Sequence, residues 1–219
     1  WMVHSFPTRR SSDLLFREKV TKVCGLYLHP PAGSIVLCVD EKTSIQALER
    51  KHPTKPPAPG RDGRHDFEYI RHGTQALLAS FCPQTGEVFG KMYDERGAKQ
   101  LVDFMEALAR RYPDQDVHIV WDNLNTHYDG PNMRWEAFNR RHGNRFHFHY
   151  TPIHASWVNQ VEIFFGIVSR RVLRHSEHRS KKALAAALLA FLDHWNEKEK
   201  HPFRWTFSGY PHQISQQAA

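Results

Sequence analysis

Three acidic residues of this chain stand where folding could bring them together. Asp40 directly follows the apolar residues 35–39, and Asp122 directly follows a second apolar run, residues 117–121. Glu162 lies near the start of a segment whose apolar residues recur at helical spacing. Clustered carboxylates repel one another and raise one another's pKa unless a cation neutralises them. Because all-oxygen ligand sets select hard cations, such a cluster would bind Mg²⁺ or Mn²⁺.

A pair of such ions would give the cluster a definite chemistry. Two divalent ions about 3.5–4 Å apart can activate a water or hydroxyl and stabilise the leaving oxygen when a phosphodiester is displaced. The chain has 30 Lys and Arg against 23 Asp and Glu, a formal net charge of +7, and 16 His that add charge in mild acid. This basic balance favours an anionic partner, nucleic acid first.

The elements that must position the acids follow from the apolar pattern. Residues 34–41 and 117–122 are continuous apolar runs that end in acids, a pattern typical of strands in a sheet covered on both faces. If the two strands are neighbours, Asp40 and Asp122 lie side by side. Because strand side chains alternate, only one of Asp40 and Glu41 can point towards Asp122.

The rest of the chain alternates strand-like and helix-like segments. Residues 74–93 form a hairpin by their turn chemistry, and residues 145–150 alternate as a strand with one wet or functional face. Residues 16–28 suit either a short helix or a lead-in. Apolar residues at helical spacing predict helices over residues 98–112, 133–141, about 158–174 and 180–197. This order predicts a mixed α/β sheet with helices on both faces.

Composition limits the class of protein. A chain of 219 residues with 40% hydrophobic residues can fold as one domain without disulfides. Its three Cys form no CxxC pair, which fits a reducing compartment. No apolar run approaches the roughly 20 residues of a membrane span, and no signal peptide is present. We therefore expect a cytoplasmic protein. Residues 51–66, rich in Pro, Lys, Arg and Gly, are either a solvated linker or a loop that contacts phosphates.

Together these motifs resemble the DDE catalytic domain of IS630/Tc1-mariner group transposases. The resemblance rests on the strand before Asp40, the strand before Asp122-Asn123, and the run Pro-Ile-His-Ala-Ser-Trp-Val-Asn-Gln-Val-Glu that ends at Glu162. It covers residues 34–195 and implies an RNase H-like fold, a five-stranded mixed sheet whose first three strands are antiparallel. It also implies that Asp40, Asp122 and Glu162 are the catalytic, metal-binding triad for Mg²⁺ or Mn²⁺, with two ions.

The resemblance further implies an activity and partners. Such enzymes cleave DNA at transposon ends and transfer the strand to target DNA, and a homodimer on DNA, in a bacterial cell at the nucleoid, is the expected arrangement. This chain departs from the group in two places. The 39 residues between Asp122 and Glu162 slightly exceed the usual spacing, and Ser-Trp-Val-Asn-Gln-Val-Glu stands where many relatives have Ser-Pro-Asp-Leu-Asn-Pro-Ile-Glu.

We accordingly divide the chain into four parts. Residues 1–15 look like a translated adaptor and form a non-native leader, and residues 16–33 are a lead-in. Residues 34–200 are the catalytic domain, and residues 201–219 are a tail. Relatives carry helix-turn-helix modules before the catalytic domain. Nothing before residue 34 would supply one, so the chain reads as a catalytic fragment.

Several readings stay open. His127 and His154 are candidates for proton shuttles or phosphate contacts, although 16 His make chance placement common. Asn123 and Asn159 are candidates to support the metal ligands. The alternatives to a transposase are an RNase H-like nuclease that only hydrolyses and a DNA-binding remnant with an inactive site. A glycosidase with two carboxylates is a weaker alternative, because it gives the basic charge no purpose.

Overall fold

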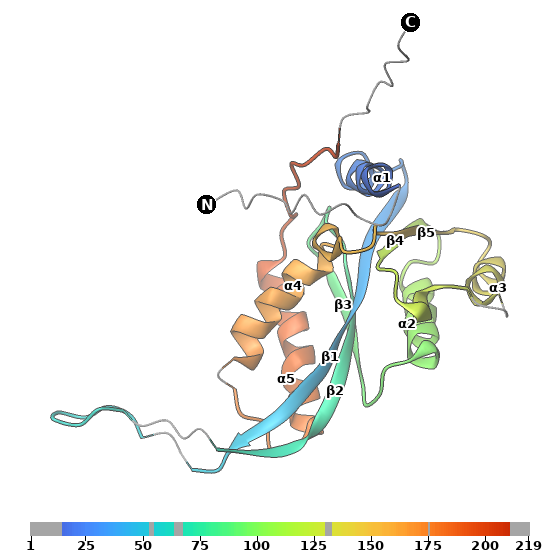
Figure 1. Cartoon of the computed structure of the whole chain (residues 1–219). Coiled ribbons are helices and arrows are strands. Elements are labelled where there is room, and N and C mark those ends of the chain that lie inside the picture. Colours follow the sequence, from blue (N-terminus) through green and yellow to red (C-terminus); the bar gives the residue numbers. More distant parts are fainter. Residues whose placement is uncertain (1–14, 53–54, 64–67, 130–132, 175, 211–219) are drawn as a thin grey trace, which may run out of the picture.

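A five-stranded mixed sheet with the order β3-β2-β1-β4-β5 forms the centre of the protein (Figure 1). The computed structural model describes residues 15–52, 55–63, 68–129, 133–174 and 176–210. The strands are β1 (Ser34–Arg50), β2 (Tyr69–Phe81), β3 (Val88–Tyr93), β4 (Asp116–Trp121) and β5 (Phe146–Tyr150). β1, β2 and β3 pair antiparallel, whereas β4 and β5 run parallel to β1. This arrangement confirms the predicted mixed sheet and its antiparallel first three strands.

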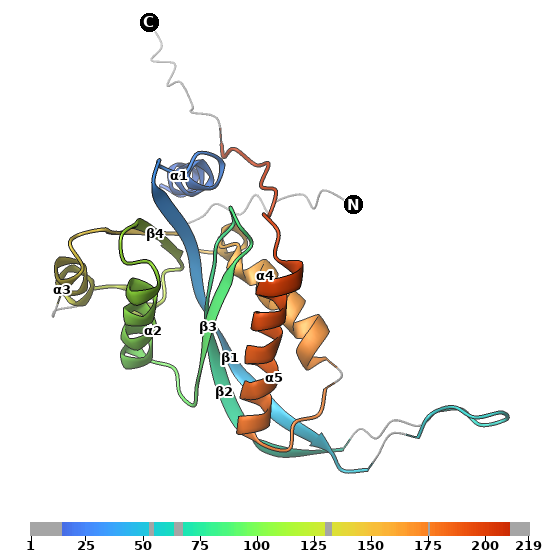
Figure 2. The same ribbon diagram turned by 180° about the vertical axis from the view of Figure 1, so that it is seen from behind.

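Helices cover both faces of this sheet (Figures 1 and 2). The α-helices are α1 (Phe16–Leu28), α2 (Ala98–Arg111), α3 (Arg134–Arg141), α4 (Val161–Val168) and α5 (Lys181–His194). Shorter turns are the 3-10 helices η1 (Asn125–His127) and η2 (Ser156–Val158) and the π-helices η3 (Ser169–Leu173) and η4 (Trp195–Glu199). The predicted helices are confirmed, and the one expected over residues 158–174 is divided into α4 and η3. No helix in the described ranges is long and apolar enough to cross a membrane.

Alternate side chains of the central strands enter two separate hydrophobic cores. On one face Val36, Cys38 and Val120 pack with α1, α4 and α5. On the other face Leu37 and Val39 pack with α2 and α3. Because both faces of β1 and β4 are covered, their sequences read as continuous apolar runs rather than as an alternation.

The prediction that the first strand ends at its two acids is wrong. β1 continues through Asp40 and Glu41 to Arg50, because β2 pairs with it as far as Arg50 opposite Tyr69. The parallel ladder to β4 ends earlier, at Cys38. The apolar run therefore marks the length of strand that is covered on both faces. The rest of β1 continues as a two-stranded ribbon with β2 (Figure 1), and its Ile45 and Ala47 are still buried on the face of α4 and α5.

The far end of this ribbon carries the basic loop. Residues 55–63 are exposed and lie well away from the helices (Figures 1 and 2). Residues 53–54 and 64–67 of the predicted loop lie outside the described residues, as do residues 1–14 of the predicted leader and 211–219 of the predicted tail.

Residues 16–28, for which the sequence left two readings, form α1 and belong to the core. Val23 is buried on the face towards the sheet. The Tyr27 hydroxyl donates a 2.9 Å hydrogen bond to the Val158 carbonyl, and the Tyr27 ring packs edge-on against Trp205. α1 thus braces η2, the turn that leads into α4.

Candidate active site

The register between β1 and β4 brings the first two acids together. Cys38 stands opposite Val120 in the parallel ladder. The same register continued by two residues sets Asp40 beside Asp122, which follows the last residue of β4. By strand alternation Asp40 lies on the sheet face of Cys38, the face that α4 covers.

The start of α4 is tied to β1 directly beside Asp40. Asn159 is fully buried, and its side-chain Nδ2 donates a 3.1 Å hydrogen bond to the backbone carbonyl of Val39. The carbonyl of Asn159 then accepts the backbone N–H of Glu162 at 3.1 Å. Glu162 is exposed in the first turn of α4. The predicted supporting role of Asn159 therefore has a structural basis, since this amide holds the helix that carries Glu162 over the strand that carries Asp40.

The electrostatics of Asp40 show that the three acids share one environment. The pKa of the Asp40 carboxyl is raised from its ordinary 3.8 to about 7, mainly by burial and in addition by the negative charges of Asp122 and Glu162. The backbone N–H of Glu41, which donates to Asp40 Oδ1 at 2.7 Å, works in the opposite direction. The ionised form of such a carboxyl is destabilised unless a cation lies beside it.

Asp122, in contrast, is stabilised in its ionised form by hydrogen bonds from its own loop. Its Oδ1 accepts the Leu124 backbone N–H at 3.0 Å and lies 2.8 Å from Nδ1 of His127. Burial raises the pKa of Asp122, but these hydrogen bonds outweigh burial and lower it. Although burial lowers the pKa of His127, its contacts with Asp122 outweigh this and raise it.

The loop after β4 is fastened to β5 by side-chain hydrogen bonds. Asn123 Nδ2 donates to the carbonyl of Thr151, and Asn123 Oδ1 accepts the Tyr128 hydroxyl at 2.6 Å. The hydroxyl of Tyr150 donates to the backbone carbonyl of His127 at 2.7 Å. Asn123 and His127 thus fix the geometry of the loop on both sides of the Asp122 carboxylate.

Comparison with known proteins identifies the family. Residues 35–185 match the family described as DDE superfamily endonuclease. The chain belongs to this family. The comparison with curated proteins gave no match for this DDE endonuclease.

Solved structures with the same fold are transposase complexes. One is the Mos1 transposase paired-end complex with left transposon end, whose sequence is 15% identical to this chain and whose TM-score is 0.57. The match covers 93% of this chain and 59% of the Mos1 chain. The pre-cleavage Mos1 transpososome is 16% identical with a TM-score of 0.56, and covers 91% of this chain and 58% of its own. At such identities the likeness shows the fold, the RNase H-like one that the sequence predicts. The chain spans somewhat under three-fifths of the Mos1 transposase.

Glu41 of this DDE endonuclease lies on the other face of β1, as alternation predicts. It shares that face with Leu37 and Val39, the α2 side of the sheet. It is not a fully solvated acid, because both carboxylate oxygens are buried and have no hydrogen-bond partner among the described residues. Burial raises its pKa, and the nearby His127 and Arg96 lower it. Glu41 is therefore a half-buried neighbour of the site.

His154 differs from His127 in its surroundings. It lies in the turn before η2 with a left-handed φ of 62° and an exposed side chain. His127 is fully buried, and its ring stacks on Trp121 at 4.8 Å between centroids. From their positions in the sequence the two histidines are equal candidates, whereas the structure connects His127 to Asp122.

The donor set suits a hard divalent cation. Asp40, Asp122 and Glu162 offer only oxygen atoms, and His127 and Leu124 occupy one oxygen of Asp122. As they stand, no three His, Cys, Asp or Glu side chains of the described ranges converge as ligands of one ion. The exposed side chain of Glu162 can change rotamer without disturbing the core, so it is the group that would complete the set.

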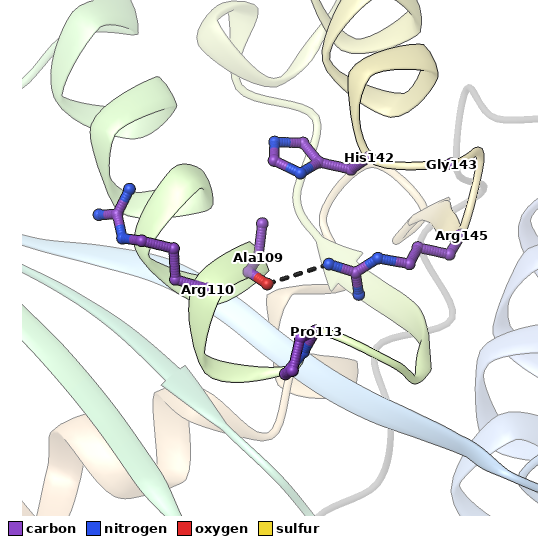
Figure 3. A pocket seen from close by; sticks show the side chains of 6 residues that line it. All are labelled: Ala109, Arg110, Pro113, His142, Gly143 and Arg145. Atoms are coloured by element: carbon purple, nitrogen blue, oxygen red, sulfur yellow. Dashed lines mark hydrogen bonds between the residues drawn. The ribbon is translucent and has the colours of Figure 1, made fainter.

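A hollow elsewhere on the surface is lined by residues that stabilise the end of α2. It is lined by Ala109, Arg110, Pro113, His142, Gly143 and Arg145 (Figure 3). The Arg145 guanidinium donates to the carbonyls of Ala109 and Gln115, each at 3.0 Å, and so satisfies carbonyl groups at and beyond the end of α2 (Figure 3). None of the three acids lines this hollow, so it has no part in the site.

Proposed function

We propose that this chain is the catalytic domain of an IS630/Tc1-mariner transposase, which cuts DNA at transposon ends and joins the freed strand to target DNA. The observation that carries the proposal is the β1–β4 register, which sets Asp40 beside Asp122 under the first turn of α4. A family description as a DDE endonuclease supports the same reaction class.

Asp40, Asp122 and Glu162 would hold divalent cations, Mg²⁺ or Mn²⁺ and two in number. Mos1 paired-end complexes have been solved with Mn and with Mg, which supports the choice of ions. When bound, such ions activate the attacking oxygen and stabilise the leaving oxygen of the phosphodiester. Burial makes the negative charge of Asp40 costly, and a bound cation would offset that cost. His127 and Leu124 orient the Asp122 carboxylate. Glu162 closes the set from α4.

DNA is the partner that the charge and the relatives support. The net charge is +7, and the Mos1 transposase paired-end complex contains the left transposon end. Exposed Lys55 and Arg61 at the end of the β1–β2 ribbon are placed to contact phosphates. Binding should then weaken with salt, with a slope of about −0.9 in log K per phosphate contact. Action on DNA as a homodimer at the bacterial nucleoid is part of this proposal.

A joining assay tests the activity. Labelled duplexes with a free 3′-OH are incubated with a supercoiled plasmid and Mn²⁺, and joined product is measured for the wild type and for Asp122→Asn. Transfer of the label by the wild type alone is the expected result. Nicking without joining would indicate a nuclease that only hydrolyses, and binding without nicking would indicate an inactive DNA-binding remnant.

A further inference from the structure

An exposed tyrosine is hydrogen-bonded to the residue that follows Asp122 in the chain. Tyr128 directly follows η1 and is 44% exposed. Its ring lies parallel to that of Tyr150 of β5, with 5.0 Å between centroids and 7° between planes. Tyr150 covers one face of the Tyr128 ring, which leaves the ring edges and the opposite face as the parts that solvent can reach.

Hydrogen bonds fix both rings of this stack. The Tyr128 hydroxyl donates to Asn123 Oδ1 at 2.6 Å, and Asn123 is the neighbour of Asp122 in the chain. The Tyr150 hydroxyl donates to the carbonyl of His127 at 2.7 Å. A surface tyrosine with no further role would be free to rotate in solvent. This one is ordered in advance, at the end of the loop that orients the Asp122 carboxylate.

An aromatic face that is both exposed and fixed is suited to stacking of a nucleobase. Every base has a π-face, so stacking tolerates any sequence, and loss of one such contact lowers affinity on the order of tenfold. We propose that Tyr128, backed by Tyr150, binds an unpaired base next to the phosphate at the acidic site. This inference rests on the proposed action on DNA, and it assigns the tyrosine pair to the end of the strand that is cut or joined.

The chain offers a matched control. Tyr69 is also 44% exposed, but it lies at the start of β2 on the ribbon, and the Arg50 guanidinium lies over its ring at 5.6 Å. Loss of Tyr69 removes an equally exposed aromatic ring without touching the loop of Asp122.

The test uses DNA duplexes that carry one unpaired 2-aminopurine at the 3′ end, with EDTA present to prevent turnover. Stacking on tyrosine quenches 2-aminopurine fluorescence. Binding of this DNA to the wild type or to Tyr128→Phe should therefore quench the 2-aminopurine fluorescence. Tyr128→Leu, which keeps an apolar cover on Tyr150, should lose the quenching and bind this DNA about tenfold more weakly. Tyr69→Leu should behave as wild type.

Blunt duplex DNA separates stacking from general binding, because Tyr128→Leu should bind it as the wild type does. Tyr128→Gln serves as a second variant should Tyr128→Leu fail to give a native circular dichroism spectrum. Wild-type quenching by folded Tyr128→Leu or folded Tyr128→Gln would overturn this inference alone. Absence of any DNA binding by the wild type would overturn the proposed function and this inference with it.

Discussion

Nδ1 of His127 lies 2.8 Å from Oδ1 of Asp122 and 3.0 Å from the backbone carbonyl oxygen of the same residue. Both partners accept, so Nδ1 carries the proton that is donated. With the Leu124 N–H on the same carboxylate oxygen, these contacts leave Oδ2 of Asp122 to face a cation. The histidine therefore orients the Asp122 carboxylate, and at the proposed metal site it would be a positioning residue that acts through Asp122.

We expect His127→Phe to weaken metal binding while the fold survives. The phenyl ring keeps the stack on Trp121 but cannot donate to Asp122. Loss of such an outer hydrogen bond lowers metal affinity on the order of 10- to 100-fold. The Mn²⁺ concentration that gives half-maximal cleavage should rise by that factor, with the maximal rate recovered at high Mn²⁺. His127→Asn keeps a donor near the Nδ1 position and should lie between this variant and wild type. An unchanged Mn²⁺ requirement in His127→Phe would contradict the positioning role.

A second prediction concerns Asp40 in the absence of metal. Its pKa is raised to about 7 from 3.8, so the folded state keeps a proton that the unfolded chain releases between these values. The stabilisation is complete below the lower value and is lost as pH rises through the higher one. In EDTA the wild type should thus melt at a lower temperature at pH 8 than at pH 6.

Asp40→Asn has no carboxyl to ionise at this position, so it should not lose stability as the pH rises, and it serves as the comparison. In EDTA at pH 8 it should be more stable than the wild type by about 2 kcal/mol, or roughly 4–8 °C in Tm for a chain of this size. Added Mg²⁺ or Mn²⁺ should stabilise the wild type and not the variant. Lower stability of Asp40→Asn under these conditions would mean that Asp40 serves the apo fold rather than a cation.

A third prediction concerns acid stability. His118 Nδ1 and His149 Nε2 lie 2.9 Å apart across β4 and β5. Burial, followed by the charges of His118, Lys22 and His147, lowers the pKa of His149 from 6.5 to about 4. The stabilisation by neutral His149 is present above its pKa in the unfolded chain, and it is lost as the pH falls through its pKa in the folded protein.

The wild type should therefore lose stability between pH 6.5 and 4, by at most about 3 kcal/mol from this group. Thermal melts from pH 7 to 4.5 measure the slope. His149→Gln should flatten it, and an equal slope in variant and wild type would show that other groups control acid unfolding.

The sequence predicted the fold well because the pattern of apolar residues records which faces are covered. It misjudged the length of β1, since the apolar run stops at Val39, where the second covered face stops, while pairing with β2 continues to Arg50. The π-helical turns that follow α4 and α5 were also missed, because a turn of five residues is too short to change the apolar pattern of a helix.

The candidate site was only partly readable. Asp40, Asp122 and Glu162 could be named from their positions at strand and helix ends, and their roles remain predictions. The contact between His127 and Asp122 could not be read, because it depends on how the loop folds back over Trp121. The Tyr128–Tyr150 stack was missed for the same reason. The strict alternation of residues 145–150 was a usable signal for a polar strand face, and His118 could be added to it only once the neighbouring strand was known.

The most direct test of the central claim is nicking of supercoiled plasmid DNA by the wild type and four single variants in Mg²⁺, Mn²⁺, Ca²⁺ or EDTA. Asp40→Asn, Asp122→Asn and Glu162→Gln keep shape but remove charge, so each should lower the rate by orders of magnitude, and combining them should cost little more. Glu41→Gln, on the opposite sheet face, is the matched control and should cost far less. Ca²⁺ should bind without supporting nicking. Circular dichroism confirms folding of each variant. Nicking in Mg²⁺ that EDTA abolishes and that only the three acid variants lose is the predicted result. Full activity in EDTA, a fully active Glu162→Gln, or a Glu41→Gln as inactive as Asp40→Asn would contradict the assignment of the site.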